Sequence, residues 1–67
     1  MERDTMRKIR QAVSNDRLPK GGFTPAQVNM ALGIHWAGTF LPKHRVGNPG
    51  KYTEHFVRID KGLYILR

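Results

Sequence analysis

The most informative absences in this chain are those of cysteine and of long apolar runs. The 67 residues include no cysteine, so neither a disulfide nor a thiolate metal site can reinforce the fold. No apolar stretch approaches the length that crosses a bilayer, and residues 1–10 lack the hydrophobic segment of a signal peptide. These absences predict a soluble, cytoplasmic protein with no membrane partner.

Acidic residues are also scarce. Five Asp and Glu face twelve Lys and Arg, which gives a formal net charge of +7 at pH 7. An excess of this size on a small body attracts polyanions over a Debye length, about 8–10 Å at ordinary ionic strength. Nucleic acid is therefore the expected partner. The alternative is that the charge only keeps a small domain soluble.

The size of the chain restricts the kinds of function that it can have. It allows one domain, residues 1–67, with a thin core and little room for a deep substrate cavity. The sequence offers no identifiable nucleophile site or phosphate-cradling loop, so we expect no catalytic residues and no enzyme. His35, His44 and His55 have no close ligand spacing and no cysteine beside them. No metal site and no cofactor are expected.

Two helices are indicated by local patterns. Apolar residues recur at spacings of three and four from Met6 to Val13, which predicts a helix over about residues 3–15. A second helix, about 25–32, begins with Thr24 as N-cap and Gln27 closing a capping box, and it ends at a glycine.

A third helix is expected over about residues 37–45, and its start is ambiguous because it contains Pro42. Proline is harmless only in a first turn, where the N–H groups have no partner within the helix. Either Thr39 is the N-cap, or the helix begins near Ala37 and bends at Pro42. We favour the start at Thr39.

The end of the chain has the composition of β-structure. HFVRI and LYILR are two β-rich runs separated by Asp60-Lys61-Gly62, which predicts a hairpin over about residues 54–67 with a glycine bulge in its turn. A two-stranded hairpin must pack on the helices to be stable. A short third strand near Phe23 is left open as an additional element of the fold. The fold class predicted is α+β, three helices followed by a hairpin.

This order is that of a winged helix-turn-helix. At the residue level the chain resembles a family of small prokaryotic winged-helix domains, known mostly as accessory modules of restriction-type and HNH-type nucleases and as short stand-alone proteins. The residues that carry the resemblance are Phe23, Thr24, Pro25 and Val28, Thr39 and His44, Asn48, and the segment FVRIDKGLYIL at 56–66. The resemblance covers about residues 5–67. It implies double-stranded DNA binding, with sensitivity to modified bases and a larger nuclease or regulatory protein as a further partner.

In a helix-turn-helix the second of the paired helices enters the major groove. Here it is the third helix of the chain, whose apolar residues Phe40 and Leu41 must face the core. The cations at its end, Lys43, His44 and Arg45, are therefore expected to face outward. Arg45 can donate two hydrogen bonds to guanine, and either it or Lys43 could instead hold phosphate. The alternative is a solvated helix end whose cations complement the helix dipole.

The loop that follows supplies further candidates for DNA contacts. Asn48 and Lys51, within residues 46–51, are predicted to contact phosphate or the minor groove, unless this loop is an ordinary turn. Lys61 at the hairpin tip is predicted to make at most one phosphate contact, because its loop is short.

Three other residues complete the predicted DNA-binding set. Thr39 begins the favoured form of the recognition helix. Thr24 lies at a helix N-terminus, where it could anchor phosphate or serve only as a cap. Trp36, the sole tryptophan, is either a wedge between helices or an aromatic surface for a base or methyl group.

Two other partners remain as alternatives to DNA. A protein-interaction module would expose Trp36, Val57 and Ile65 together as an apolar patch. Structured RNA would be bound by shape through the same charges. A homodimer or tandem partner is also expected, because one small module covers little DNA surface.

Overall fold

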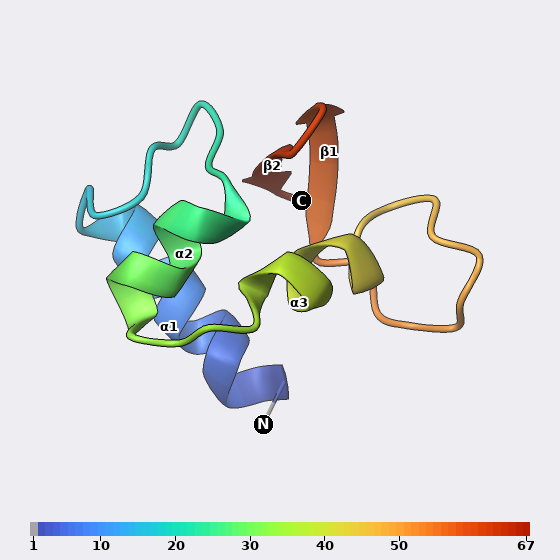
Figure 1. Cartoon of the computed structure of the whole chain (residues 1–67), viewed down its shortest axis with the longest axis horizontal. Helices are drawn as coiled ribbons and strands as arrows, with labels where there is room; N and C mark the ends of the chain where they lie inside the picture. Colours follow the sequence, from blue (N-terminus) through green and yellow to red (C-terminus); the bar gives the residue numbers. More distant parts are fainter. Residues whose placement is uncertain (1) are drawn as a thin grey trace.

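The computed structural model describes residues 2–67, which form three helices and one antiparallel hairpin in an α+β arrangement. The elements are α1 (Glu2–Ser14), α2 (Pro25–Leu32), α3 (Ala37–Lys43), β1 (Phe56–Asp60) and β2 (Leu63–Leu66). The chain between α3 and β1 projects to one side, away from the turn that joins α1 to α2 (Figure 1). Within this described part of the chain, no helix has the length and apolar character to span a bilayer.

The first helix is amphipathic, as the spacing of its apolar residues predicts. Its basic side chains are exposed, while its apolar side chains face the rest of the molecule. The buried apolar residues are Met6, Ile9, Ala12 and Val13. After α1 the chain returns to the core at Leu18, which is only 1% exposed. The turn-rich segment between α1 and α2 therefore contributes to the core as well as connecting the helices.

The capping signals of α2 are confirmed. Thr24 Oγ1 accepts a hydrogen bond from the Gln27 N–H at 3.2 Å, and the Thr24 N–H donates to Gln27 Oε1 at 2.8 Å. Together these bonds complete the capping box. Pro25 occupies the first turn, and Gly33 ends the helix with φ of 68°, the left-handed conformation that a glycine adopts at little cost.

The favoured start of the third helix at Thr39 is wrong. α3 runs from Ala37 to Lys43, so Thr39 lies inside its first turn. The Ala37 N–H donates to Asn29 Oδ1 at 3.0 Å, so a side chain of α2 satisfies the helix start. Pro42 precedes the last helical residue, where its missing N–H interrupts only the end of the hydrogen-bond ladder.

The hairpin has the turn that its sequence predicts. Its register shifts between Arg58 and Asp60, and Gly62 has φ of 70°, consistent with a bulged turn. Near Phe23, where the sequence left open a short third strand, the structure has a single antiparallel bridge to Tyr64. In this bridge the Phe23 N–H donates to Tyr64 O at 2.8 Å, and the Tyr64 N–H donates to Phe23 O at 2.9 Å.

The core joins the helices to the hairpin through aromatic side chains. The ring of Phe56 meets those of Phe23 and Phe40 edge-on, with centroids 6.1 Å apart in both pairs. Phe56 and Tyr64 are both buried. Because Phe56 is the first residue of β1, this packing also fixes where the loop after α3 rejoins the body.

Candidate nucleic-acid interface

The site begins where α3 ends. We call residues 43–51 the basic segment, because they carry Lys43, Arg45 and Lys51. The Val46 N–H donates to Phe56 O at 2.8 Å, and the Phe56 N–H donates to the carbonyl at position 44 at 3.2 Å. These bonds join both ends of the projecting loop at the start of β1 (Figure 1). The cations are therefore carried on a segment that is tied to the core at its base.

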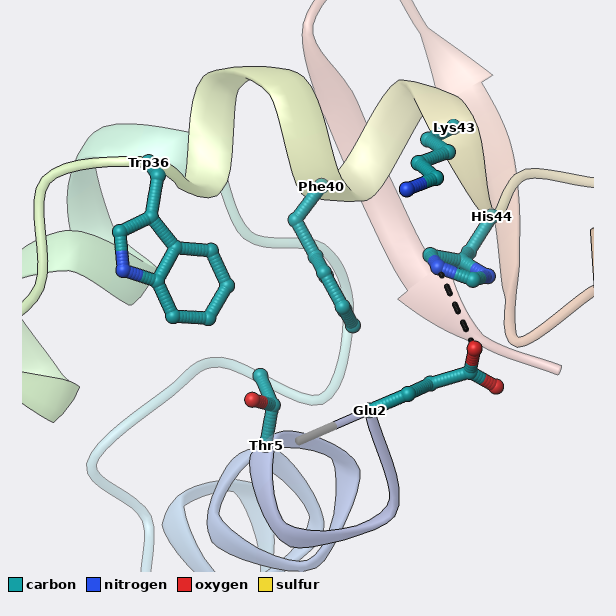
Figure 2. Close-up of a pocket in the computed structure, with 6 residues that line it drawn as sticks. All are labelled: Glu2, Thr5, Trp36, Phe40, Lys43 and His44. Carbon is teal, nitrogen blue, oxygen red and sulfur yellow. Dashed lines mark ion pairs between the residues drawn. The ribbon is translucent and has the colours of Figure 1, made fainter.

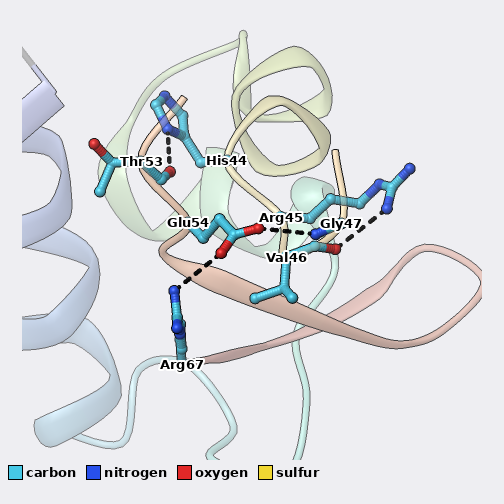
Figure 3. A network of polar contacts seen from close by, with 7 residues as sticks. All are labelled: His44, Arg45, Val46, Gly47, Thr53, Glu54 and Arg67. Carbon is cyan, nitrogen blue, oxygen red and sulfur yellow. Dashed lines mark hydrogen bonds and ion pairs between the residues drawn. The ribbon is translucent and has the colours of Figure 1, made fainter. Parts of the chain in front are cut away.

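The loop is also held by hydrogen bonds within itself. Asn48 Nδ2 donates to Pro42 O at 2.9 Å, and Asn48 Oδ1 accepts from the Gly50 N–H at 2.8 Å. The Gly47 N–H donates to Glu54 Oε2 at 3.0 Å (Figure 3). Asn48 is half-buried and uses both ends of its amide, so its first role here is to shape the loop and cap the end of α3.

The three cations of the basic segment have different surroundings. The Lys43 ammonium lies 4.7 Å from the centroid of the Tyr52 ring, a cation–π contact, and both residues are exposed. Arg45 is half-buried, and its Nη1 donates to Val46 O at 3.3 Å (Figure 3). Lys51 is exposed. All three guanidinium or ammonium groups retain donors that a ligand could use.

These charges are not neutralised by the chain. Among residues 2–67, Asp4 pairs with Arg7 and Lys8, and Glu54 pairs with Arg67 (Figure 3). Within the same residues, no ion pair involves a cation of the basic segment. Lys43, Arg45 and Lys51 are therefore available to an anionic ligand, as are other cations, such as Arg10 and Lys20, that form no ion pair among these residues.

The expectation that His44 faces outward is wrong. Its side chain is 3% exposed, and its ring lies 4.6 Å from that of Phe40, centroid to centroid. His44 Nδ1 lies 2.8 Å from the Thr53 carbonyl oxygen, so Nδ1 carries the proton and donates (Figure 3). The sequence does contain a signal for this burial. His44 lies three residues after Leu41 and seven after Ala37, and these spacings place it on the same buried face of the helix.

The remaining predicted contacts are spread over other elements. Thr39 is exposed on α3, and Lys61 is exposed at the hairpin tip, a strand's length from the basic segment. Thr24 is engaged in the cap of α2. Lys43, Arg45, Asn48 and Lys51 thus share one segment of the chain, whereas Lys61 and Thr24 lie on other elements.

Trp36 lies beside a pocket between α1 and α3. Its indole is half-buried and meets the Phe40 ring edge-on, with centroids 5.5 Å apart. The pocket has a volume of about 350 Å³ and is lined by Glu2, Thr5, Trp36, Phe40, Lys43 and His44 (Figure 2). Trp36 therefore packs on Phe40, four residues further along the chain, and leaves part of its ring on the pocket.

The same pocket brings two histidines to one carboxylate. His55 Nε2 lies 2.8 Å from Glu2 Oε2, and His44 Nε2 lies 3.7 Å from Glu2 Oε1 (Figure 2 shows the second contact). The hydrogen bond from His55 lowers the pKa of the Glu2 carboxyl, and the charges of His44, His55 and Lys43 lower it further. His44 and His55 have no close ligand spacing in the sequence, but the fold places both beside Glu2. His35 is exposed and outside this cluster.

Comparison of the chain with protein-family models, with curated proteins and with solved structures finds no match.

Proposed function

We propose that this chain is a winged-helix module that binds double-stranded DNA through α3 and the basic segment. The observation that carries the proposal is the grouping of Lys43, Arg45 and Lys51 in one nine-residue segment, where none of them forms an ion pair with a carboxylate of residues 2–67. A net charge of +7 strengthens the attraction at long range.

The order of elements supports the winged-helix part of the proposal. Three helices precede an antiparallel hairpin, and the bridge between Phe23 and Tyr64 occupies the place of a minimal third strand. In such a module α3 approaches the major groove and the hairpin lies beside the phosphate backbone. Lys61 at the hairpin tip then makes a peripheral phosphate contact.

The proposed contacts divide between bases and phosphates. Gly38 and Thr39 are exposed on α3, and the absence of a side chain on Gly38 allows close approach of the helix backbone. Arg45 has the fork of donors that suits guanine in the major groove, whereas Lys43 and Lys51 suit phosphate. Asn48 keeps the loop in position for these contacts. This is a binding role, and we assign no catalytic step to the chain.

Sensitivity to modified bases is a further part of the proposal. The exposed part of Trp36, beside the pocket, is the aromatic surface available for a base or a methyl group. Recording amide shifts by NMR during titration with unmodified and methylated duplexes tests it. The expected result is a larger shift at positions 35–40 with the methylated duplex, and identical shifts with both duplexes would contradict it.

The protein-interaction alternative has less support. Trp36, Val57 and Ile65 are half-buried and do not form the exposed apolar patch that this alternative predicts. The large apolar side chains that are most exposed lie on three parts of the molecule: Met30 on α2, Ile59 on β1, and Val46 and Tyr52 in the loop between α3 and β1. Scattered apolar side chains are usual on a soluble protein.

The experiment is a fluorescence-anisotropy titration of labelled duplex DNA at several salt concentrations. The double variant Lys43→Ala, Lys51→Ala should bind more weakly and should lower the magnitude of the salt slope by about 2, because each lost phosphate contact removes about 1. Both side chains are exposed, so the melting temperature should stay nearly unchanged.

The matched control is Arg10→Ala, Lys20→Ala, which removes the same charge from exposed positions on α1 and the turn after it. It should leave the slope close to that of the wild type. Equal losses in the two double variants would contradict a localised interface, and stronger binding of duplex RNA than of duplex DNA would favour the RNA alternative.

A further inference from the structure

Three residues from separate parts of the chain meet at the base of the projecting loop. Glu2 begins α1, His44 follows α3, and His55 directly precedes β1. One ligand atom of each residue, a carboxylate oxygen or an imidazole nitrogen, lies within 4.8 Å of the other two. Two imidazoles and one carboxylate are a ligand set that suits Zn²⁺ and related divalent transition metals.

The most buried member of the cluster is His44. Its side chain is buried, and its Nδ1–H donates to the Thr53 carbonyl at 2.8 Å. In the neutral ring with its proton on Nδ1, Nε2 has the lone pair that a metal would bind, and this nitrogen lies 3.7 Å from Glu2 Oε1. Metal-binding histidines typically use their second nitrogen in this way, because the outer hydrogen bond orients the ring and makes the ligand nitrogen more basic.

The second imidazole is also held in place. His55 is 14% exposed at its side chain, and its ring lies 5.3 Å from the His44 ring, centroid to centroid. Its Nε2 now donates to Glu2 Oε2 at 2.8 Å. A divalent cation would take the place of the proton in that contact, releasing the proton to solvent.

We propose that Glu2, His44 and His55 form a Zn²⁺-binding site, with the remaining coordination position open to water in the pocket of Figure 2. Zn–N and Zn–O bonds of about 2.0–2.2 Å place ligand atoms about 3.4 Å apart in a tetrahedral site. The 2.8 Å contact between His55 and Glu2 must therefore lengthen, and the 3.7 Å contact between His44 and Glu2 must shorten. Glu2, with a side chain that is 44% exposed in the first turn of α1, is the ligand free to move.

A metal bound at this site would cross-link separate parts of a chain that has no disulfide. His44 and His55 bracket the projecting loop, and Glu2 attaches the start of α1 to the same point. A metal bound there would restrict the loop ends and the first helix together, which stabilises a small domain with a thin core. This inference depends only on the cluster and stands whether or not the chain binds DNA.

The test is a titration of EDTA-treated protein with Zn²⁺, using competition with a chromogenic zinc chelator and the melting temperature as separate readouts. We expect one Zn²⁺ per chain, bound with a Kd of about 1 μM or below, and a melting temperature that rises with Zn²⁺. Co²⁺ should give the visible absorption of a four-coordinate site. In ¹⁵N NMR, Zn²⁺ should shift the Nε2 resonances of two histidines.

Variants decide whether the cluster is responsible. Glu2→Gln and His55→Gln should each weaken Zn²⁺ binding at least tenfold, and both positions are exposed enough for the fold to persist. His35→Gln is the matched control: it removes the exposed histidine outside the cluster and should leave affinity unchanged. Three outcomes would each overturn the proposal: no Zn²⁺ binding by the wild type, unchanged affinity in His55→Gln, or loss of affinity in His35→Gln.

Discussion

At the scale of single residues, neighbours in the sequence occupy opposite environments. Lys43 is exposed and lies over the Tyr52 ring, whereas the adjacent His44 is buried against Phe40. Successive residues of an α-helix are about 100° apart around its axis, so helical phase decides which of two polar residues enters the core. An imidazole tolerates burial when a carbonyl accepts its N–H, and here the Thr53 carbonyl does so.

A second residue-scale finding concerns Asn29. Its Oδ1 accepts from the Ala37 N–H, and Ala37 is fully buried. Trp36 precedes the helix and provides no side-chain cap of its own. The side chain that begins α3 therefore belongs to α2, and it also ties the two helices together.

The Asn29 cap leads to a direct comparison of two variants. Asn29→Ala should lower the free energy of unfolding by about 1–2 kcal/mol, because it removes a cap and leaves a buried N–H without its acceptor. Thr39→Ala should change it by less than about 0.5 kcal/mol, since Thr39 is an exposed residue inside the helix. Urea denaturation followed by circular dichroism measures both. Asn29→Asp, which keeps an acceptor oxygen, should recover part of the loss, and a larger cost at Thr39 would mean that α3 starts there.

At the scale of elements, the hairpin depends on the turn that precedes α2. Gly22 has φ of 144°, and a Cβ added there would lie 2.9 Å from Leu63 Cγ and 3.1 Å from Ile59 Cδ1. The adjacent residue Phe23 forms the bridge to Tyr64. The backbone at Gly22 thus approaches both strands closely, and only glycine fits that approach without displacement.

This packing makes adjacent glycines unequal. Gly22→Ala should destabilise the fold by about 1–3 kcal/mol, because it combines an unfavourable backbone conformation with contacts to two hairpin side chains. Gly21→Ala, where the added Cβ meets nothing within 4 Å, should change stability by about 0.5 kcal/mol or less. Thermal unfolding of the two variants side by side measures the difference. Similar melting temperatures would show that the hairpin does not pack on this turn.

At the scale of the whole molecule, the position of charge matters as much as its amount. The acidic residues Asp4 and Glu54 neutralise cations on α1 and at the chain end, Arg67. The cations of the basic segment have no carboxylate partner among residues 2–67. Arg10, Lys20 and Lys61 also form no ion pair within the described residues. We therefore propose that a polyanion prefers the basic segment because three cations are grouped within its nine residues.

The whole-molecule prediction is a steep dependence of DNA affinity on salt. If about four to six phosphates are contacted, the slope of log affinity against log salt concentration should be about −4 to −5, because counterions are released from the duplex. The measurement is duplex affinity by fluorescence anisotropy over a range of NaCl concentrations. A slope near zero would contradict an electrostatic interface of this size.

Much of the fold was predictable because its signals are local. The apolar spacing of α1, the capping box of α2 and the glycine in the hairpin turn each involve residues within a few positions of one another. The start of α3 was not predictable in this way. The N-terminus of α3 is capped by Asn29, which lies eight residues before Ala37, whereas the local sequence favoured Thr39 as the N-cap.

The candidate interface was predictable only in part. Lys43 and Lys51 are exposed as a basic cluster suggests, and Arg45 is half-exposed beside them. Asn48 lies in the expected loop, yet its amide holds the end of α3 and the loop backbone. Spacing along the chain assigns residues to a segment, but it does not assign the hydrogen bonds that each side chain makes.

By itself, the sequence determined the helical stripes, the cap of α2, the hairpin turn and the excess of positive charge. These follow from nearest-neighbour geometry and from composition, which folding does not alter. Only the tertiary structure decided that His44 is buried and that Glu2, His44 and His55 meet. Their meeting depends on the packing of α1, α3 and the start of β1, and that packing is set by the shared core rather than by spacing along the chain.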